Sequence, residues 1–263
     1  MVETTPEAAV SETILYEVKD RIAYITLNRP DVLNALNRAM LRRWGEIVQA
    51  FNTDPEPLVA IVHGAGDRAF SVGVDLKERA VRDESGARRR GRRPGPPNLM
   101  EKPVIAAING FCIAGGMEIA LQCDIRIATP KSQFGLPEPR WSLPAGYGLH
   151  MLSRMVPLGE ALAMQLTGER IGAQRAYEIG LVQRLVPEER LMETAREIAQ
   201  SVLLCAPLAV RAIKRVVMTG RDLPLEESWR LAAGLTEELA ATEDAREGPR
   251  AFAEKRTPQW KGR

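Results

Sequence analysis

A chain of 263 residues is long enough to bury a large core and to form one α/β domain with a small appendage. Apolar residues make up 45% of the chain and charged residues 27%, as in ordinary globular enzymes. The 36 Lys and Arg residues nearly balance the 34 Asp and Glu residues, and this net charge of +2 excludes a general electrostatic attraction to nucleic acid or to a membrane surface.

Short runs of β-branched and apolar residues predict strands at residues 22–27, 58–63, 104–108 and 124–128. Strands that alternate with helices are typical of βαβ units and of a largely parallel sheet. Because the chain after residue 158 is almost entirely helical, we predict an α/β core at residues 1–200 and a helical C-terminal region at residues 201–263. Helical periodicity predicts helices at residues 38–51, 117–122, 158–166, 173–179, 188–204, 208–219, 225–241 and 245–255.

The most informative segment is the apolar run that contains Glu118. Residues 111–123 are all apolar or glycine except Glu118 and Gln122, whose spacing of four places them on one helix face. The polar and glycine breaks in residues 104–121 favour a buried strand, turn and helix over a membrane span. Because an ionised carboxylate is rarely buried without a partner, Glu118 points to a function. Glu138, in a second segment punctuated by glycine and proline, is its candidate partner.

Residues 79–97 form a dense run of arginine, glycine and proline that fits no regular element. Such a run is typical of a solvated surface loop. Two functional alternatives are that its arginines attract a phosphorylated ligand or that they bind RNA, although no aromatic residues are interleaved to stack on bases. The arginines concerned are Arg82, Arg88, Arg89, Arg90, Arg92 and Arg93.

Other residue types argue against several chemistries. His63 and His150 are the only histidines, so a site with three His ligands is impossible and we expect no bound metal. The chain has no phosphate-binding loop, serine nucleophile elbow or dinucleotide fingerprint. The three cysteines lack C-x-x-C spacing, and the first twenty residues lack a basic and apolar leader, so we expect unpaired thiols, no secretory signal and a cytoplasmic protein.

A set of short motifs covers nearly the whole chain. They are Asn28-Arg-Pro with Asn34-Ala-Leu, Ala69-Phe-Ser-Val-Gly-Val-Asp-Leu-Lys-Glu, Lys102-Pro-Val-Ile-Ala-Ala-Ile-Asn-Gly, Ala114-Gly-Gly-Met-Glu, Cys123-Asp-Ile-Arg-Ile-Ala, Phe134-Gly-Leu-Pro-Glu, Leu166-Thr-Gly, Ala176-Tyr-Glu-Ile-Gly-Leu-Val and Glu247-Gly-Pro-Arg-Ala-Phe-Ala-Glu-Lys-Arg. Each motif alone is weak, but in this order the set resembles the enoyl-CoA hydratase/isomerase family, the crotonases.

The resemblance implies a fold, an assembly and a ligand. The fold would be an α/β spiral of ββα units with a helical C-terminal region that serves oligomerisation, giving a homotrimer or a dimer of trimers. The ligand would be an acyl-CoA thioester, with no separate cofactor because coenzyme A is part of the substrate. Since the charge of the chain is balanced, we expect neither a DNA nor a membrane partner.

The resemblance also implies an oxyanion hole made of backbone N–H groups, which holds the enolate formed from the thioester carbonyl. By motif these groups belong to Val74 and to Gly115, and a glycine turn that opens a helix does present donors and a positive dipole end to an anion. Val74 replaces a more usual alanine, which keeps the donor and narrows the pocket. Motif positions that line the path of adenine and pantetheine in the family are Ala35, Val72, Asp75, Leu76 and Lys77.

Both glutamates of the family's hydratases are present, as Glu118 and Glu138. They imply that the two acids act on one water in the reversible hydration of a trans-2-enoyl-CoA. After Glu138 the chain departs from the hydratase pattern, and Trp141 and Tyr147 stand near the expected acyl pocket, either as packing residues or as residues that shape acyl recognition. The alternatives are an isomerase, hydrolase or decarboxylase of the same family, or a non-catalytic RNA-binding member.

Overall fold

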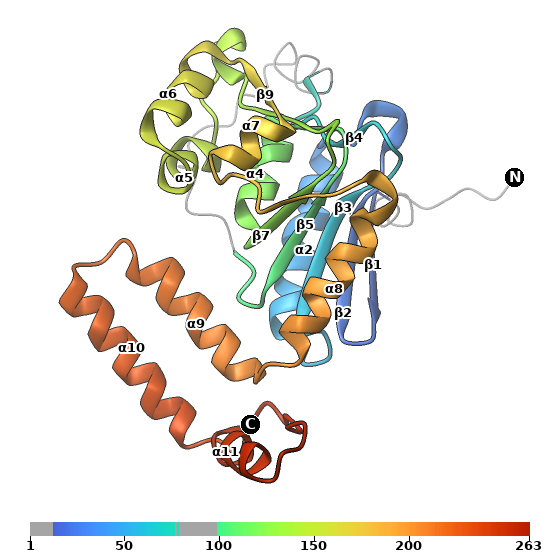
Figure 1. Cartoon of the computed structure of the whole chain (residues 1–263). Helices are drawn as coiled ribbons and strands as arrows, with labels where there is room; N and C mark the ends of the chain where they lie inside the picture. Colours follow the sequence, from blue (N-terminus) through green and yellow to red (C-terminus); the bar gives the residue numbers. More distant parts are fainter. Residues whose placement is uncertain (1–12, 77, 79–98) are drawn as a thin grey trace, which may run out of the picture.

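The computed structural model describes residues 13–76, 78 and 99–263, and within these ranges the strands form two sheets (Figure 1). Strands β1 and β9 are antiparallel to their neighbours, and the other pairings are parallel. The six-stranded sheet has the order β1 (Ile14–Lys19), β2 (Ile22–Leu27), β3 (Val59–Gly64), β5 (Val104–Ile108), β7 (Ile125–Ala128) and β10 (Arg184–Leu185). The four-stranded sheet has the order β4 (Ala69–Ser71), β6 (Phe111–Ile113), β8 (Gln133–Gly135) and β9 (Arg170–Gly172).

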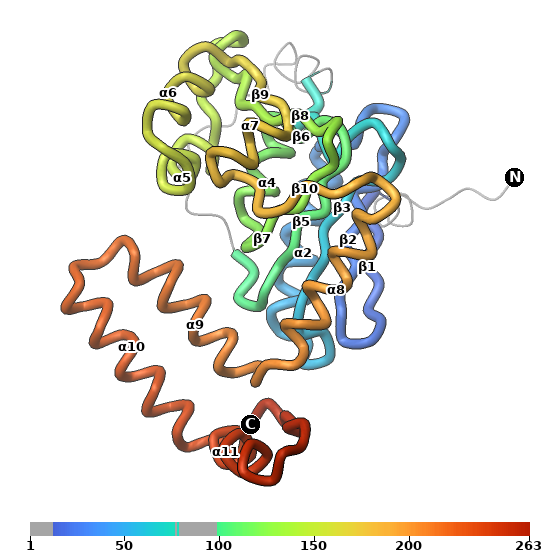
Figure 2. The backbone as a smooth tube through the Cα atoms, viewed as in Figure 1, coloured from blue at the N-terminus to red at the C-terminus, as the bar shows by residue number. Residues whose placement is uncertain are grey.

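The chain alternates between the two sheets as it advances. Each of the pairs β3–β4, β5–β6 and β7–β8 places its first strand in the six-stranded sheet and its second in the four-stranded sheet. Parallel neighbouring strands cannot be joined by a tight hairpin, so the chain must cross over between one strand of a sheet and the next parallel strand of that sheet. The tube in Figure 2 follows this winding. The structure therefore confirms the α/β spiral of ββα units.

Helices surround the sheets and extend beyond them. Three single turns of 3-10 helix, η1 (Pro30–Val32), η2 (Glu138–Trp141) and η3 (Glu188–Arg190), lie in the connections. The α-helices described are α2 (Arg38–Thr53), α4 (Gly115–Gln122), α5 (Tyr147–Met155), α6 (Leu158–Thr167), α7 (Ala173–Glu178), α8 (Leu191–Leu203), α9 (Pro207–Gly220), α10 (Leu225–Ala240) and α11 (Asp244–Ala253).

The central strands of the six-stranded sheet are buried on both faces, which explains why β5 is apolar throughout and β3 is apolar over its first four residues. Along β3, Ile61 packs into the cluster that α8 covers, whereas its neighbour Val62 packs into the cluster formed with α2 and α4. The second cluster includes Phe51 from α2 and Met117 from α4, both fully buried. Burying a side chain of this size contributes about 1.5–3 kcal/mol, so this packing holds α4 firmly against the sheet.

The four strands predicted from sequence are present to within one residue at each end. Strands β1 and β10 and all strands of the four-stranded sheet were not predicted. The strands of the four-stranded sheet have three residues each, too few to show a two-residue period. Helix α5 was also missed, because Pro144 and Gly146 just before it indicate a turn. Residues 104–121 form β5, β6 and most of α4, and no helix within the described ranges has the length and apolar character needed to cross a membrane.

The C-terminal helices project from the α/β core, with α9 and α10 side by side (Figure 2). Lys214 ties α9 to the core, because its Nζ lies 2.7 Å from Oδ2 of Asp124 and donates to the Lys102 carbonyl oxygen. Large apolar side chains on these helices are exposed, among them Trp229 at 71% and Phe252 at 87%. The predicted role of this region in oligomerisation stays a prediction.

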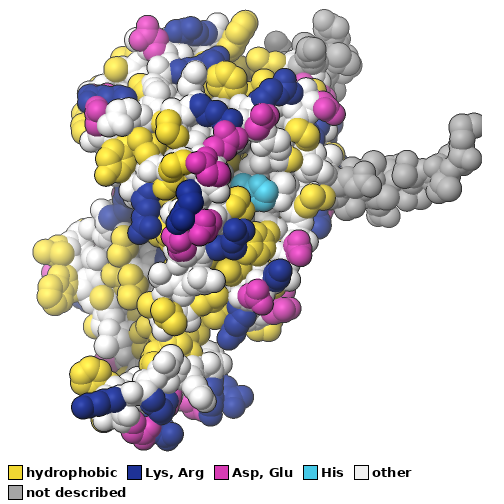
Figure 3. All heavy atoms as spheres, turned by 45° about the vertical axis from the view of Figure 1, so that its right-hand side comes forward, with side chains coloured by type: hydrophobic (Ala, Val, Ile, Leu, Met, Phe, Trp, Pro, Cys, Tyr) yellow, Lys and Arg dark blue, Asp and Glu magenta, His cyan; other side chains and the backbone are white. Residues whose placement is uncertain are grey.

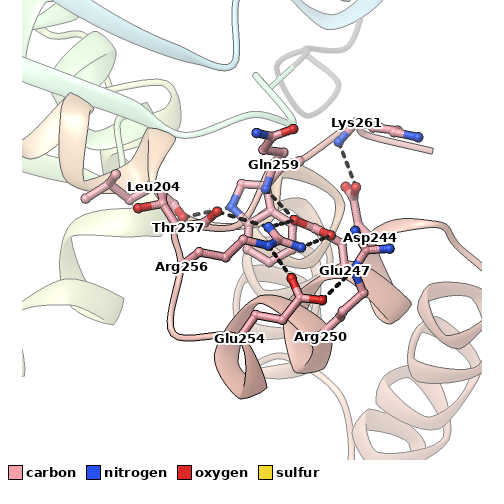
Figure 4. Close-up of polar contacts among 10 residues, drawn as sticks. Leu204, Asp244, Glu247, Arg250, Glu254, Arg256, Thr257, Gln259 and Lys261 are labelled. Atoms are coloured by element: carbon pink, nitrogen blue, oxygen red, sulfur yellow. Dashed lines mark hydrogen bonds and ion pairs between the residues drawn. The ribbon is translucent and has the colours of Figure 1, made fainter.

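Polar contacts fasten the end of the chain to α11 (Figure 4). The buried carboxylate of Asp244 accepts hydrogen bonds from the N–H groups of Lys261, at 2.7 Å, and Gly262, at 2.9 Å. Glu247 forms two bonds with the Arg256 guanidinium, and this contact lowers the pKa of Glu247 to about 2. The last residues are therefore part of the helical region.

The face drawn in Figure 3 carries basic and acidic side chains interspersed with one another. Exposed ion pairs such as Lys131 with Glu188 illustrate this mixing. A surface of alternating sign has little long-range field, which agrees with the small net charge of the chain.

Candidate active site

A pocket of about 660 Å³ lies beside the four-stranded sheet, at the N-terminal end of α4 and along η2. Residues from both of these elements line it, together with the segment that follows β4 and the segment that precedes β9. The spiral therefore brings together residues that are far apart in sequence. The predicted site residues that line this pocket are Val72, Val74, Leu76, Gly115, Glu118, Glu138 and Trp141.

Two backbone turns touch at the floor of this pocket. Gly73 has a φ of +82°, and a Cβ added there would lie 2.6 Å from the Gly115 nitrogen. A Cβ on Gly115 would in turn lie 3.6 Å from the Val74 nitrogen. Only glycine at position 73 permits both the positive φ and this close approach. The amides of Val74 and Gly115 are therefore neighbours in space.

Both amides are available as donors. Among the described residues, neither the Val74 N–H nor the Gly115 N–H donates a hydrogen bond. Gly115 is the first residue of α4, where the helix leaves its N–H groups without intrahelical partners and presents its positive dipole end. The preceding residue, Ala114, has a φ of +52°, a conformation that a non-glycine residue adopts only when its surroundings impose it. This arrangement can bind an oxyanion.

Glu118 lies in the first turn of α4, with its carboxylate held against the start of α5. Its Oε1 accepts a hydrogen bond of 3.0 Å from the Gly148 N–H. A Cβ on Gly146 would lie 3.2 Å from the same oxygen, so glycine at that position leaves room for the carboxylate. Burial raises the pKa of Glu118, and the N–H groups of Gly148 and Gly146 oppose that shift.

Glu138 begins η2, on another wall of the same pocket. Its Oε2 is buried and has no hydrogen-bond partner among the described residues. Burial raises the pKa of Glu138, its own backbone N–H opposes the shift, and the negative charge of Glu118 raises the pKa further. Because both glutamates line the same pocket, ionising one carboxyl group makes ionising the other harder.

Comparison with known proteins shows the family of this chain. The sequence model of the enoyl-CoA hydratase/isomerase family matches residues 17–263. The chain belongs to this family. It is 40% identical over 253 residues to the (E)-benzylidenesuccinyl-CoA hydratase of Thauera aromatica, covering 95% of this chain and 99% of that protein. It is 38% identical over 267 residues to the carnitinyl-CoA dehydratase of Escherichia coli strain K12, covering 97% of this chain and all of that one.

Solved structures of the family have the same fold. An enoyl-CoA hydratase from Bacillus anthracis superimposes with a TM-score of 0.88 at 35% identity, covering 95% of this chain and 100% of that one. An enoyl-CoA hydratase/isomerase from Mycobacterium paratuberculosis gives a TM-score of 0.85 at 42% identity, covering 95% and 99%. The resemblance inferred from the ordered motifs is thus confirmed.

Three other residues predicted from family motifs, Ala35, Asp75 and Tyr147, are not among the residues that line the pocket. Ala35 is buried, and its carbonyl oxygen accepts a 2.6 Å hydrogen bond from Arg29. Asp75 forms an ion pair of 3.3 Å with the same guanidinium. Tyr147 packs against the core, and burial raises the pKa of its hydroxyl. Lys77 and the arginine-rich run at residues 79–97 lie outside the described residues.

Two further residues of the family motifs support the donor turn, and sequence reasoning gave neither a role. The Ser71 hydroxyl donates to the Asn34 carbonyl oxygen at 2.8 Å and accepts from the Gly73 N–H at 3.2 Å. The Asn34 amide donates to the Ala69 carbonyl oxygen at 2.8 Å. Both side chains are fully buried. The sequence signal for this role was Ser71, a polar residue next to the apolar Ala69-Phe70 run. A polar group in such a buried setting needs hydrogen-bond partners.

Across residues 13–76, 78 and 99–263, no three His, Cys, Asp or Glu side chains converge into a set that could hold a metal ion. The two carboxyl groups of the pocket can transfer protons, and its two backbone N–H groups can stabilise negative charge.

Proposed function

We propose that this protein is an enoyl-CoA hydratase-like lyase that adds water reversibly across the double bond of a trans-2-enoyl-CoA. The observation that carries the proposal is the meeting of two carboxyl groups and two free backbone donors in one pocket. Burial raises the pKa of both glutamates, and the charge of Glu118 raises that of Glu138 further, as expected of two carboxyl groups that titrate as a pair.

The thioester carbonyl oxygen would accept hydrogen bonds from the Val74 and Gly115 N–H groups. These donors stabilise the negative charge that develops as the carbonyl becomes an enolate, and one such donor typically lowers the barrier by about 3–4 kcal/mol. Val72 and Leu76 line the same pocket and would border the pantetheine arm. Trp141, also on the wall, would limit the shape of the acyl group.

A water molecule between Glu118 and Glu138 would be the nucleophile. One carboxylate removes a proton from the water as its oxygen bonds to the β-carbon, and the π electrons move onto the thioester oxygen. The enolate then collapses and takes a proton from the carboxyl pair at the α-carbon. One water is consumed and the pair returns to its starting protonation state. General acid–base assistance of this kind contributes typically ~10²–10⁴-fold.

The experiment that tests this proposal is a panel of trans-2-enoyl-CoA thioesters of varied length and branching, followed by the loss of the absorbance of the conjugated double bond. Hydration predicts that absorbance falls and that the product gains the mass of one water. Formation of a shifted double bond without water would indicate an isomerase, and release of free CoA would indicate a hydrolase. A panel in which no member is converted would refute the hydratase proposal.

The pH dependence of kcat/KM follows from the shifted glutamates. The general base must be ionised, and burial raises the pKa of both carboxyl groups above the ordinary value of 4.5. Activity should therefore be lost, as pH falls, at a pH above 4.5. In Glu118→Gln the negative charge that raises the pKa of Glu138 is gone. The pH at which the residual activity falls on the acid side should therefore be lower than in the parental enzyme. A parental limb at or below 4.5 would contradict these assignments.

The assembly is a further part of the proposal. We expect a homotrimer or a dimer of trimers in which the exposed apolar side chains of α9 to α11, such as Trp229 and Phe252, are covered. Light scattering coupled to gel filtration should then give three or six times the 29.1 kDa mass of one chain. A monomer across the working concentration range would overturn this expectation.

A further inference from the structure

Two arginines line the same pocket as the two glutamates, and the proposed reaction uses neither. Arg140 lies in η2, two residues after Glu138. Arg170 begins β9 and lines the pocket from the four-stranded sheet. Both side chains are exposed at the open side of the pocket, where a ligand could reach them.

Local packing orients both arginines. The Nε of Arg140 donates to the Thr167 carbonyl oxygen at 3.0 Å, and a Cβ on Gly168 would lie 3.1 Å from Cγ and Nε of Arg140. Because Gly168 has no side chain, Arg140 can lie along its backbone, and among the described residues the outer N–H groups of the Arg140 guanidinium have no hydrogen-bond partner. The Arg170 guanidinium stands over the Phe111 ring at 5.3 Å, a cation–π contact that holds it on the pocket side of β6, the side of Ile113.

Neither guanidinium forms an ion pair within the part of the chain that the structure describes, whereas Arg154 and Arg256 each pair with a carboxylate. Glu169 also lines the pocket but makes no ion pair with either arginine. The general base of the proposed reaction is an ionised glutamate, so the pocket wall carries negative as well as positive charge. What distinguishes Arg140 and Arg170 is that, among the described residues, their guanidinium groups have no carboxylate partner, and an anion in the pocket would supply one.

Resting on the proposed hydration, we propose that Arg140 and Arg170 form an anion subsite for a carboxylate on the acyl group, so that the substrate is the CoA monothioester of an unsaturated dicarboxylic acid. Arginine suits this role because its planar fork binds carboxylates with two parallel hydrogen bonds. The other anion that an acyl-CoA carries is the phosphate of its CoA moiety. The position of Arg140 favours the acyl carboxylate, because Arg140 shares a single turn with Glu138, which acts at the α- and β-carbons.

The decisive measurement compares glutaconyl-CoA and its longer homologues with the monocarboxylic trans-2-enoyl-CoA of the same length. The subsite predicts that the best dicarboxylic thioester has a kcat/KM higher by about 10- to 100-fold, as expected for hydrogen bonds to a charged group. Arg140→Met and Arg170→Met should each reduce that preference by about tenfold and leave the monocarboxylic substrate nearly unchanged. Arg184→Met, an exposed arginine outside the pocket, is the matched control and should leave the ratio unaltered.

Two further measurements distinguish failure of the acyl subsite from failure of the proposed hydration. If the arginines bind a CoA phosphate, the same variants will weaken both acyl types equally, and the effect will disappear with pantetheine thioesters, which overturns the acyl subsite. If no enoyl-CoA is hydrated, the proposed reaction fails, but the subsite can still be measured by calorimetry with glutaryl-CoA against pentanoyl-CoA. Equal affinities for those two ligands, or a parental enzyme without preference, would refute the subsite while leaving the hydratase proposal to stand on its own test.

Discussion

Glu118→Gln and Glu138→Gln are each expected to lower kcat for enoyl-CoA hydration by about 10²–10⁴-fold, with little change in the affinity for a saturated acyl-CoA. Glutamine keeps the volume of the side chain and, at position 118, an oxygen that can still accept the Gly148 hydrogen bond. It cannot take a proton from water or return one to the α-carbon. Single-turnover kinetics and calorimetric binding to butyryl-CoA separate the two effects.

Stability gives this prediction an internal control. Burial raises the folded-state pKa of both acids, so between the unfolded and folded pKa values the native state binds more protons than the unfolded chain. The contribution of these groups to stability is therefore present at low pH and is lost as pH rises through the folded pKa. Replacing either acid by neutral glutamine should leave the Tm at neutral pH unchanged or higher. A double variant that hydrates substrate at the parental rate would refute the mechanism.

Gly115→Pro should lower kcat by about 10²–10³-fold, because proline has no N–H to donate to the thioester oxygen. The position is the first residue of α4, where proline is tolerated in helices, so the helix itself can form. Gly115→Ala is the matched control, since it keeps the N–H and adds a Cβ 3.2 Å from Cδ1 of Leu36, a side-chain atom that can shift. We expect Gly115→Ala to retain most of the activity.

Gly73→Ala tests the same donors from the other turn. The added Cβ would lie 2.6 Å from both the Gly115 nitrogen and the Ala114 Cβ, and the φ of +82° would be strained. The two turns must then separate, so both donors move and activity should fall as in Gly115→Pro. Val74→Ala keeps every donor and should retain activity with altered acyl-chain preference. A Gly115→Pro protein with native circular dichroism and parental kcat would show that the carbonyl is polarised elsewhere.

Sequence alone predicted structural elements and site residues whose signal is a local pattern. Continuous apolar runs are visible wherever a strand is buried on both faces, so β2, β3, β5 and β7 were predicted within one residue. Glu118 was noticeable because it interrupts an apolar helix, and ordered motifs added Glu138, Val74 and Gly115. Each of these predictions rests on residues that are neighbours in the chain.

Tertiary structure decided which of these segments meet. The pairing of β4 with β6, with Ala69 opposite Phe111, brings the turn at Gly73 against the start of α4, more than forty residues later in the chain. The same long-range packing pairs Asp75 with Arg29 and packs Tyr147 against the core. It also places Arg140 and Arg170 on the wall of one pocket. Strand register and helix docking depend on contacts between distant residues, which no local period encodes. Sequence therefore determined the candidate reacting groups and the main strands of the fold. The arrangement that brings these groups into one pocket came from packing between distant segments.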